Sequence, residues 1–373
     1  MASSRADQTR AAWLATLEKF RYDADRPASA DLWSPRLDAA SRGELAAIQT
    51  EKLRVLVPFL YENSPFYRRR FERHGLLPTD LRELDDLKKW PVVDKTEMMA
   101  DAAEHPPYGT YTTMSDEVWA RRGWMMFFSS GSTGAPRVFR YSHVDREAWA
   151  WANARALLSM GFRHGETVFM ITGYGPHVWA WGVQPRARAN VIVRFKPTMV
   201  LCTPSYALHL GRVMQEMGHD PAATSVHTLF VAGEPALAIE PTRRRIESLW
   251  NARIVEFYGC TEASAHAGGY SCPALTKDAT PATHLMEDTQ IWEVVDPESR
   301  QALPHGKRGL TVVTNLNSES SPQLRFLVGD YATFDPARCA CGRTHMRAIG
   351  AFAGRADDLI NLRGIKMFPI QIE

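Results

Sequence analysis

The chain has 373 residues, 45% of them hydrophobic, and its 44 Lys and Arg nearly balance 42 Asp and Glu. A formal charge of +2 gives no electrostatic footprint for nucleic acid or an anionic membrane, so small-molecule chemistry is expected. No apolar run is long enough to span a membrane, and the five cysteines do not resemble the disulfide framework of a small secreted domain. We therefore expect a cytoplasmic protein with no nucleic-acid or membrane partner.

The first hundred residues are predicted to be helical. Apolar residues from Leu45 to Phe59 recur at helical spacing, and the pattern breaks at Ser64 and Pro65. Between 120 and 260, short apolar runs alternate with helical stretches, which predicts an α/β fold with a largely parallel sheet. The runs interpreted as buried strands are WMMFF (124–128), ETVFMI (166–171), NVIVRF (190–195), TMVLC (198–202), TLFVAG (228–233) and RIVEFYG (253–259).

Two of these predicted strands, 190–195 and 198–202, lie too close together for a parallel crossover, which needs a dozen or more residues. Either they are not parallel neighbours or a connecting segment is missing. From 284 to 335, strand-like runs with turn residues between them predict a second, more antiparallel β region.

A small polar cluster follows the strand candidate at 124–128. It consists of Ser, Gly and Thr residues at 129–134, and Arg137 adds a positive charge behind it. Backbone N–H groups and hydroxyls there can converge on an anion, although the spacing is not that of a Walker A loop. A simple Ser/Gly turn between two strands explains the composition equally well.

Three later stretches carry further polar groups at strand ends. YGCTE (258–262) offers a hydroxyl beside a carboxylate, as a Mg²⁺-dependent phosphoryl site needs. In LVGDY (327–331), the carboxylate of Asp330 can accept both hydroxyls of a ribose. GRADD (354–358) adds Arg355 and an Asp pair. Each stretch alone also fits an ordinary turn or a solvated loop.

The order of these motifs resembles that of the acyl-adenylate-forming enzymes, and most closely their phenylacetate-CoA ligase branch. The resemblance extends over nearly the whole chain and includes SSGSTGAPRVFRYS, FKPTMVLCTPSYAL, AGEP, YGCTE, CACGR and GRADDLINLRGIKMFPIQIE. It implies a two-step reaction: a carboxylate attacks the α-phosphorus of ATP to give an acyl-AMP and pyrophosphate, and the thiol of coenzyme A then takes the acyl group.

The resemblance also implies a domain organisation. We expect a large adenylation domain with mainly parallel sheets flanked by helices, a β-rich subdomain, and a hinge leading to a small lid. The expected divisions are 1–110 (helical region), 111–270 (nucleotide- and acid-binding core), 271–353 (β-rich, with the zinc knuckle) and 354–373 (hinge and start of the lid).

The roles of individual residues follow from the same resemblance. It implies that Thr261 donates to the α-phosphate, Glu262 holds Mg²⁺, Asp330 binds the ribose, and Arg355 reaches the ribose or the phosphates. The ATP phosphates and the departing pyrophosphate are expected at Ser129, Ser130, Gly131, Ser132, Thr133, Gly134 and Arg137. The adenine is expected beside Gly233, Glu234, Pro235, Phe257 and Tyr258. Asp357 is expected at the hinge, and Gly364 at the thiol tunnel.

The acid is expected to bind where the family lines its carboxylate pocket, at TGYGPHVWAWG (172–182). Its aromatic wall suits an aryl group; helix core is the alternative interpretation. The expected substrate-binding residues are Tyr174, His177, Trp179, Trp181 and Gly259. The usual glycine-rich pattern of the family is altered here, which leaves open an acid other than phenylacetate.

Four residues of the β-rich region, Cys272, His284, Cys339 and Cys341, form a set that suits structural, tetrahedral Zn²⁺. The spacing does not match a standard zinc finger, so inert reduced thiols remain the alternative, and His266 is a substitute for His284. Similarity to relatives with a cysteine-histidine cluster in this region favours zinc.

The chain departs from the family pattern at its end. Relatives continue beyond the hinge into a lid whose lysine contacts the α-phosphate, and this implies that the present chain binds ATP and acid but adenylates poorly. The first functional hypothesis is an aryl-acid-CoA ligase, with a homodimer compatible with it. The alternatives are transfer to an amine, a carrier-protein thiol or another non-CoA acceptor, diazotase-like use of nitrite, or nucleotide binding without turnover.

Overall fold

The computed structural model describes residues 4–21, 32–128, 137–171, 185–263, 268–275, 281–352, 354–356, 360–362 and 365–367, the last two as backbone only. Ten strands form one sheet in the order β3-β4-β5-β6-β7-β8-β12-β11-β10-β9. Two short antiparallel pairs, β1-β2 and β13-β14, are separate from it. None of the helices in these residues is both long and apolar enough to cross a membrane.

Helices dominate the first part of the chain and strands the last. The helices and 3-10 turns (η) are α1 (Arg5–Lys19), α2 (Pro35–Asp38), α3 (Arg42–Asn63), α4 (Pro65–Arg73), η1 (Pro78–Asp80), η2 (Leu84–Lys89), α5 (Lys95–Glu104), α6 (Asp116–Arg122), α7 (His143–Ser159), α8 (Pro185–Phe195), α9 (Pro204–Glu216), η3 (Pro221–Ala223) and α10 (Glu240–Trp250). The strands are β1 (Gly123–Phe128), β2 (Val138–Ser142), β3 (Val168–Met170), β4 (Met199–Cys202), β5 (Thr228–Ala232), β6 (Arg253–Tyr258), β7 (Gly269–Tyr270), β8 (Ala282–Leu285), β9 (Gln290–Val295), β10 (Arg308–Asn315), β11 (Phe326–Asp335), β12 (Arg347–Ile349), β13 (Ile360–Leu362) and β14 (Ile365–Met367).

Local sequence signals define the ends of the N-terminal helices. Ser41 and Glu44 form a reciprocal capping box at the start of α3: the Ser41 hydroxyl accepts from the Glu44 N–H at 3.2 Å, and the Glu44 carboxylate accepts from the Ser41 N–H at 2.7 Å. Ser64 ends α3 and caps α4, with Pro65 at its first position. The predicted break at Ser64 and Pro65 is therefore confirmed.

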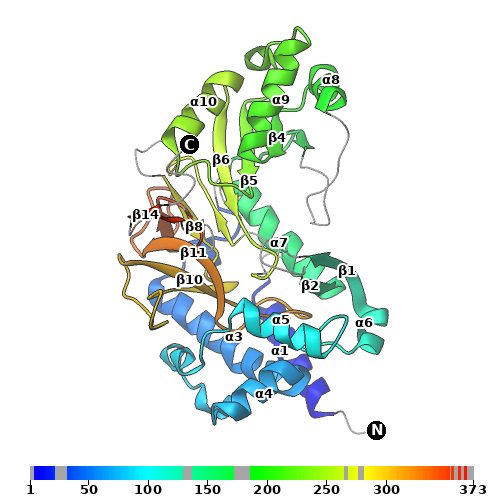
Figure 1. The fold of residues 1–373 in the computed structure, drawn as a ribbon, viewed down its shortest axis with the longest axis vertical. Coiled ribbons are helices and arrows are strands. Elements are labelled where there is room, and N and C mark those ends of the chain that lie inside the picture. Colours follow the sequence, from blue (N-terminus) through cyan, green and yellow to red (C-terminus); the bar gives the residue numbers. More distant parts are fainter. Residues whose placement is uncertain are drawn as a thin grey trace.

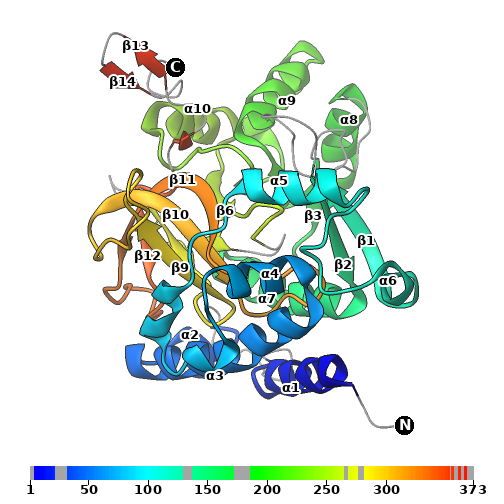
Figure 2. The ribbon, with the colours of Figure 1, turned by 60° about the horizontal axis from the view of Figure 1, so that its bottom comes forward.

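The sheet has a parallel half and an antiparallel half. β3, β4, β5 and β6 pair in parallel, and Figure 1 shows α8, α9 and α10 gathered around this end of the molecule. The predicted α/β fold is confirmed. The strand-rich region after residue 280 is antiparallel, as expected, and it continues the same sheet through β7 and β8. Figure 2 shows α1, α2 and α3 on the side of the molecule opposite α9 and α10.

The prediction of a strand at 190–195 is wrong, because these residues belong to helix α8. Arg188, Ala189 and Ile192 are buried in α8, where Ile192 follows Ala189 by three residues and Arg188 by four, as on one helix face, whereas Val193 and Phe195 are exposed. A short run of apolar residues does not by itself distinguish a strand from a helix. The run at 190–195 is therefore part of the helix that precedes β4, so no connecting segment is missing there, and β3 and β4 are parallel neighbours.

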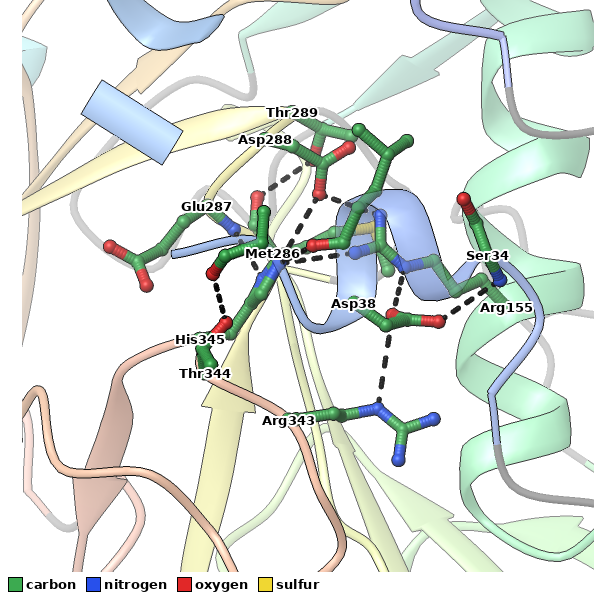
Figure 3. A network of polar contacts seen from close by, with 12 residues as sticks. Ser34, Asp38, Arg155, Met286, Glu287, Asp288, Thr289, Arg343, Thr344 and His345 are labelled. Atoms are coloured by element: carbon green, nitrogen blue, oxygen red, sulfur yellow. Dashed lines mark hydrogen bonds and ion pairs between the residues drawn. The ribbon is translucent and has the colours of Figure 1, made fainter. Parts of the chain in front are cut away.

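A network of buried charges joins the N-terminal helices to the antiparallel half of the sheet (Figure 3). Arg155 of α7 donates to Asp38 at 2.5 Å and to Asp288 at 2.6 Å, and all three side chains are fully buried. Burial opposes the ionisation of Asp288, but Arg155 and the other nearby positive charges outweigh burial and hold its pKa below the ordinary value. The guanidinium thus compensates two carboxylates that have lost their contact with water.

We predict that Arg155→Met lowers the free energy of unfolding by about 3–5 kcal/mol, because it leaves two buried carboxylates without their principal counter-charge. Urea denaturation followed by circular dichroism measures the change. The matched control is Arg244→Met, since the Arg244 side chain is 73% exposed and pairs with Glu240 on the surface of α10. Its expected cost is less than about 1 kcal/mol. Equal losses of unfolding free energy in the two variants would contradict the conclusion that the buried network stabilises the protein more than a surface ion pair does.

Candidate functional site

The end of β6 and the residues after it are held by three other parts of the chain. The Tyr141 hydroxyl of β2 donates to the Thr261 carbonyl at 2.6 Å, and the Gln290 amide donates to the Ala263 carbonyl at 2.5 Å. Arg137 forms an ion pair with Glu262, and both side chains are largely buried. This anchoring fixes the backbone of a polar segment that has no regular secondary structure.

The carboxylate of Asp330, in β11, is hydrogen-bonded to Tyr258, at the end of β6, and to Arg355. The Tyr258 hydroxyl donates to one carboxylate oxygen, and Arg355 donates to the other at 3.2 Å. Asp330 and Arg355 also form an isolated backbone bridge. Burial, followed by the charge of Asp330, raises the pKa of Tyr258 well above its ordinary value, so Tyr258 remains a hydrogen-bond donor at neutral pH.

Aromatic rings surround the same tyrosine. Tyr258 stacks on Phe352 with ring centroids 3.5 Å apart and an interplanar angle of 7°, and Trp292 lies 5.9 Å from each ring. Phe257 points elsewhere: it is 4% exposed and packs edge-on against Phe230 at 5.5 Å. Packed aromatic rings therefore hold Tyr258 in place beside a carboxylate and a guanidinium, polar groups that are suited to a sugar.

The segment after β5 contains Gly233, Glu234 and Pro235, which the sequence analysis expects beside the adenine. Gly233 has φ of +86°, in the left-handed region that favours glycine. Glu234 accepts hydrogen bonds from the Ser205 N–H at 2.9 Å and its hydroxyl at 2.7 Å, at the first turn of α9. Farther along, the N–H groups of Ala236 and Leu237 donate to Oε2 of Glu256 in β6, at 3.1 and 2.9 Å.

The structure brings together two sets of the residues singled out from the sequence. Arg137 lies with Glu262, and Asp330 lies with Tyr258 and Arg355. Sequence reasoning did not single out Tyr141, Phe352 or Glu256; of these, only Glu256 gave a signal, as a carboxylate inside an apolar strand. Several predicted residues lie outside the described residues: Ser129, Ser130, Gly131, Ser132, Thr133, Gly134, Tyr174, His177, Trp179, Trp181, His266, Asp357 and Gly364.

A second cluster lies beyond β7. Cys272, His284, Cys339 and Cys341 place their ligand atoms within 4.8 Å of one another. The Sγ atoms of Cys272 and Cys339 are 3.9 Å apart, and Cys341 Sγ is 3.3 Å from His284 Nε2. Tetrahedral Zn²⁺ with Zn–S bonds of about 2.3 Å separates two thiolates by about 3.8 Å, so the four residues fit this metal. Arg343 donates to Cys341 Sγ at 3.5 Å, which compensates thiolate charge.

Comparison with known proteins agrees with the fold. The family model described as "AMP-binding enzyme" matches residues 74–315, and the chain belongs to this family. It is 32% identical to phenylacetate-coenzyme A ligase of Thermus thermophilus over 92% of the chain and 77% of the relative. It is 30% identical to the Escherichia coli enzyme of the same name, over 90% of the chain and 77% of that relative.

A solved structure is similar along almost the whole chain. 2-Hydroxyisobutyryl-CoA ligase in the postadenylation state, in complex with 2-HIB-AMP, matches with a TM-score of 0.86 and 27% sequence identity. The match covers 95% of this chain and 76% of the ligase. The family and fold inferred from the motif order are thus confirmed.

Proposed function

We propose that the protein is an AMP-forming acid-CoA ligase that activates an aryl or arylacetic acid with ATP and transfers the acyl group to coenzyme A. The observation that carries the proposal is 30–32% identity, across nine-tenths or more of the chain, to four proteins named phenylacetate-coenzyme A ligase. The similar solved ligase holds an acyl-AMP in one state and an acyl-AMP with CoA in another.

In the first step, a carboxylate oxygen of the acid forms a bond to the α-phosphorus of ATP, and the bond from that phosphorus to pyrophosphate breaks. We assign Asp330 to the ribose hydroxyls and Tyr258 to the base, since the carboxylate of Asp330 in β11 accepts from the hydroxyl of Tyr258 at the end of β6. Arg137 and Arg355 supply positive charge for the phosphates. Glu262 offers the oxygen ligand that Mg²⁺ prefers, and a bound Mg²⁺ would neutralise phosphate charge.

In the second step, the sulfur of coenzyme A forms a bond to the acyl carbon, the bond from that carbon to the phosphate oxygen of AMP breaks, and AMP and the thiol proton are released. The chain needs no covalent nucleophile for either step, because its residues position two substrates and stabilise charge. Cys260 does not serve as a nucleophile either. Burial raises the pKa of its thiol, so the thiol stays protonated beside the site.

We predict that phenylacetate or a related aryl acid stimulates ATP–pyrophosphate exchange above the rate without acid. The measurement is a screen of arylacetic, benzoic and short aliphatic acids, including 2-hydroxyisobutyrate. Adding coenzyme A to the best acid should release AMP and form a thioester. Exchange that coenzyme A does not convert to thioester would indicate another acceptor, and ATP binding with no exchange for any acid would contradict the proposed reaction.

Two substitutions separate nucleotide binding from metal-dependent chemistry. We predict that Asp330→Ala weakens ATP binding tenfold or more, because charge-assisted hydrogen bonds to the ribose are worth about 1.5–3 kcal/mol. Glu262→Gln should retain ATP binding but lose Mg²⁺-dependent exchange. Isothermal titration calorimetry and the exchange assay measure the two effects. Asp85→Ala is the control, since its side chain is 80% exposed; unchanged ATP affinity in Asp330→Ala would contradict the ribose assignment.

We also propose that Cys272, His284, Cys339 and Cys341 hold a structural Zn²⁺. Four N and S donors with no position left for water are typical of a metal that stabilises a fold rather than one that performs catalysis. The donors come from the residues just after β7, from β8 and from the loop before β12, so one ion would join three segments.

Elemental analysis of the purified protein should find about one zinc per chain. Cys339→Ala should lose this zinc and lower the melting temperature, because a tetrahedral site with three protein ligands binds the metal less tightly. Cys202→Ala removes another buried cysteine, which lies in the core at the end of β4, and should leave the zinc content unchanged. Wild-type protein without zinc, or Cys339→Ala with full zinc content, would contradict the assignment.

A further inference from the structure

We infer that Glu256 is a positioning residue of the nucleotide site: its carboxylate holds the segment 233–237, on one side of the site, at a fixed distance from the end of β6. The inference rests on the proposed function, since it concerns the ATP that this site binds. Glu256 belongs to none of the motifs assigned to ATP above. Its role follows from its position between two of these motifs, the segment that begins at Gly233 and the YGCTE motif.

The contact itself is specific. One carboxylate oxygen of Glu256 accepts from two consecutive backbone N–H groups, those of Ala236 and Leu237. These amides directly follow Gly233, Glu234 and Pro235 in the chain. Two donors on one acceptor fix both the position and the direction of the backbone, whereas a single hydrogen bond leaves it free to rotate.

The backbone of Glu256 is also held by hydrogen bonds on both sides. Its N–H donates to the Ser271 hydroxyl at 2.7 Å, and its carbonyl accepts from the Ser271 N–H at 2.9 Å. On the opposite side, β6 pairs with β5, with Glu256 opposite Val231. The residues that follow Glu256 are Phe257 and Tyr258, so the same strand carries both the carboxylate and the aromatic residue assigned to the base.

Burying a carboxylate at this position of the strand costs free energy. Glu256 is 4% exposed, and its neighbours Ile254, Val255 and Phe257 are buried and apolar. Burial raises the pKa of Glu256 more than the two backbone hydrogen bonds lower it. An apolar residue would avoid this cost but would leave the amides of residues 236 and 237 unpaired. The carboxylate is therefore explained by the segment it holds rather than by the stability of the strand.

This reasoning predicts that the reach of the side chain matters more than its charge. Glu256→Gln keeps an acceptor oxygen at the same distance from the backbone. Glu256→Asp keeps the charge but withdraws the carboxylate by about 1.5 Å, one carbon–carbon bond. If the carboxylate sets the separation between the 233–237 segment and β6, the shorter acid will distort the site and the amide will not.

The experiment measures ATP affinity by isothermal titration calorimetry, and KM and kcat by pyrophosphate exchange, in wild type, Glu256→Gln and Glu256→Asp. Glu298→Gln, an exposed surface substitution, is the control. We expect Glu256→Asp to raise the Kd and KM for ATP at least tenfold, with the KM for the acid and kcat at saturating ATP within threefold of wild type. Glu256→Gln should remain within threefold of wild type for ATP.

Several results would overturn the inference. Unchanged ATP affinity in Glu256→Asp would show that the reach is irrelevant, and equal losses in both variants would assign the effect to charge. A parallel loss for ATP and acid together with a lower melting temperature would show a merely structural role. Should Glu256→Asp fail to fold, Glu256→Gln decides, because a tenfold loss of ATP affinity in it is incompatible with positioning by an acceptor oxygen.

Calorimetry also keeps this test separate from the proposed function. Wild-type protein that binds ATP but activates no acid would contradict the ligase activity and leave the Glu256 comparison valid. Wild-type protein that binds no ATP would contradict the nucleotide site itself, and with it the role of Glu256.

Discussion

β6 forms hydrogen bonds with a parallel strand, β5, on one side and with an antiparallel strand, β7, on the other. Because β5 and β6 run in the same direction, the segments that follow them emerge at the same edge of the sheet, where ligands commonly bind in α/β folds. The antiparallel half then brings β11, with Asp330, to the same edge by a different route. Residues from distant parts of the chain meet at this point because the sheet is continuous across the change of strand direction.

Charges that are entirely buried join that continuous sheet to the N-terminal helices. Arg155, Asp38 and Asp288 compensate one another between α7, α2 and the turn before β9. Such groups lose much of their hydration on folding, and the loss is tolerated only where hydrogen bonds satisfy them. The loop that supplies Cys339 and Cys341 reaches the same region, since the Thr344 N–H donates to the Asp38 carbonyl at 3.2 Å. The loop that contains Cys339, Cys341 and Thr344 is therefore held both by the proposed zinc site and by the buried network.

The sequence analysis predicted most where local residue order carries the information. Tyr258 to Glu262, Asp330 and Arg355 were found as motifs, and the four cysteine and histidine residues as a set. Helix α8 was not predicted, because an apolar run of six residues fits either a strand or a helix. Only the burial of one helix face in the structure distinguishes the two. Tyr141 and Glu256 were also missed: their partners lie 120 residues away in one case and about 20 in the other, and only the fold selects them.

The ion pair between Arg137 and Glu262 connects the fold to the proposed chemistry. Both side chains are largely buried, so neither charge is stable there without a partner of opposite sign. In the proposed reaction, Arg137 binds phosphate and Glu262 binds Mg²⁺, and the Mg²⁺ complex of ATP supplies both partners at once. The exchange conserves the charge balance of the site, whereas ATP without the metal would bring phosphate oxygens towards an uncompensated carboxylate. The proposed reaction therefore depends on the metal–nucleotide complex for the charge balance of this pair as well as for the phosphoryl chemistry.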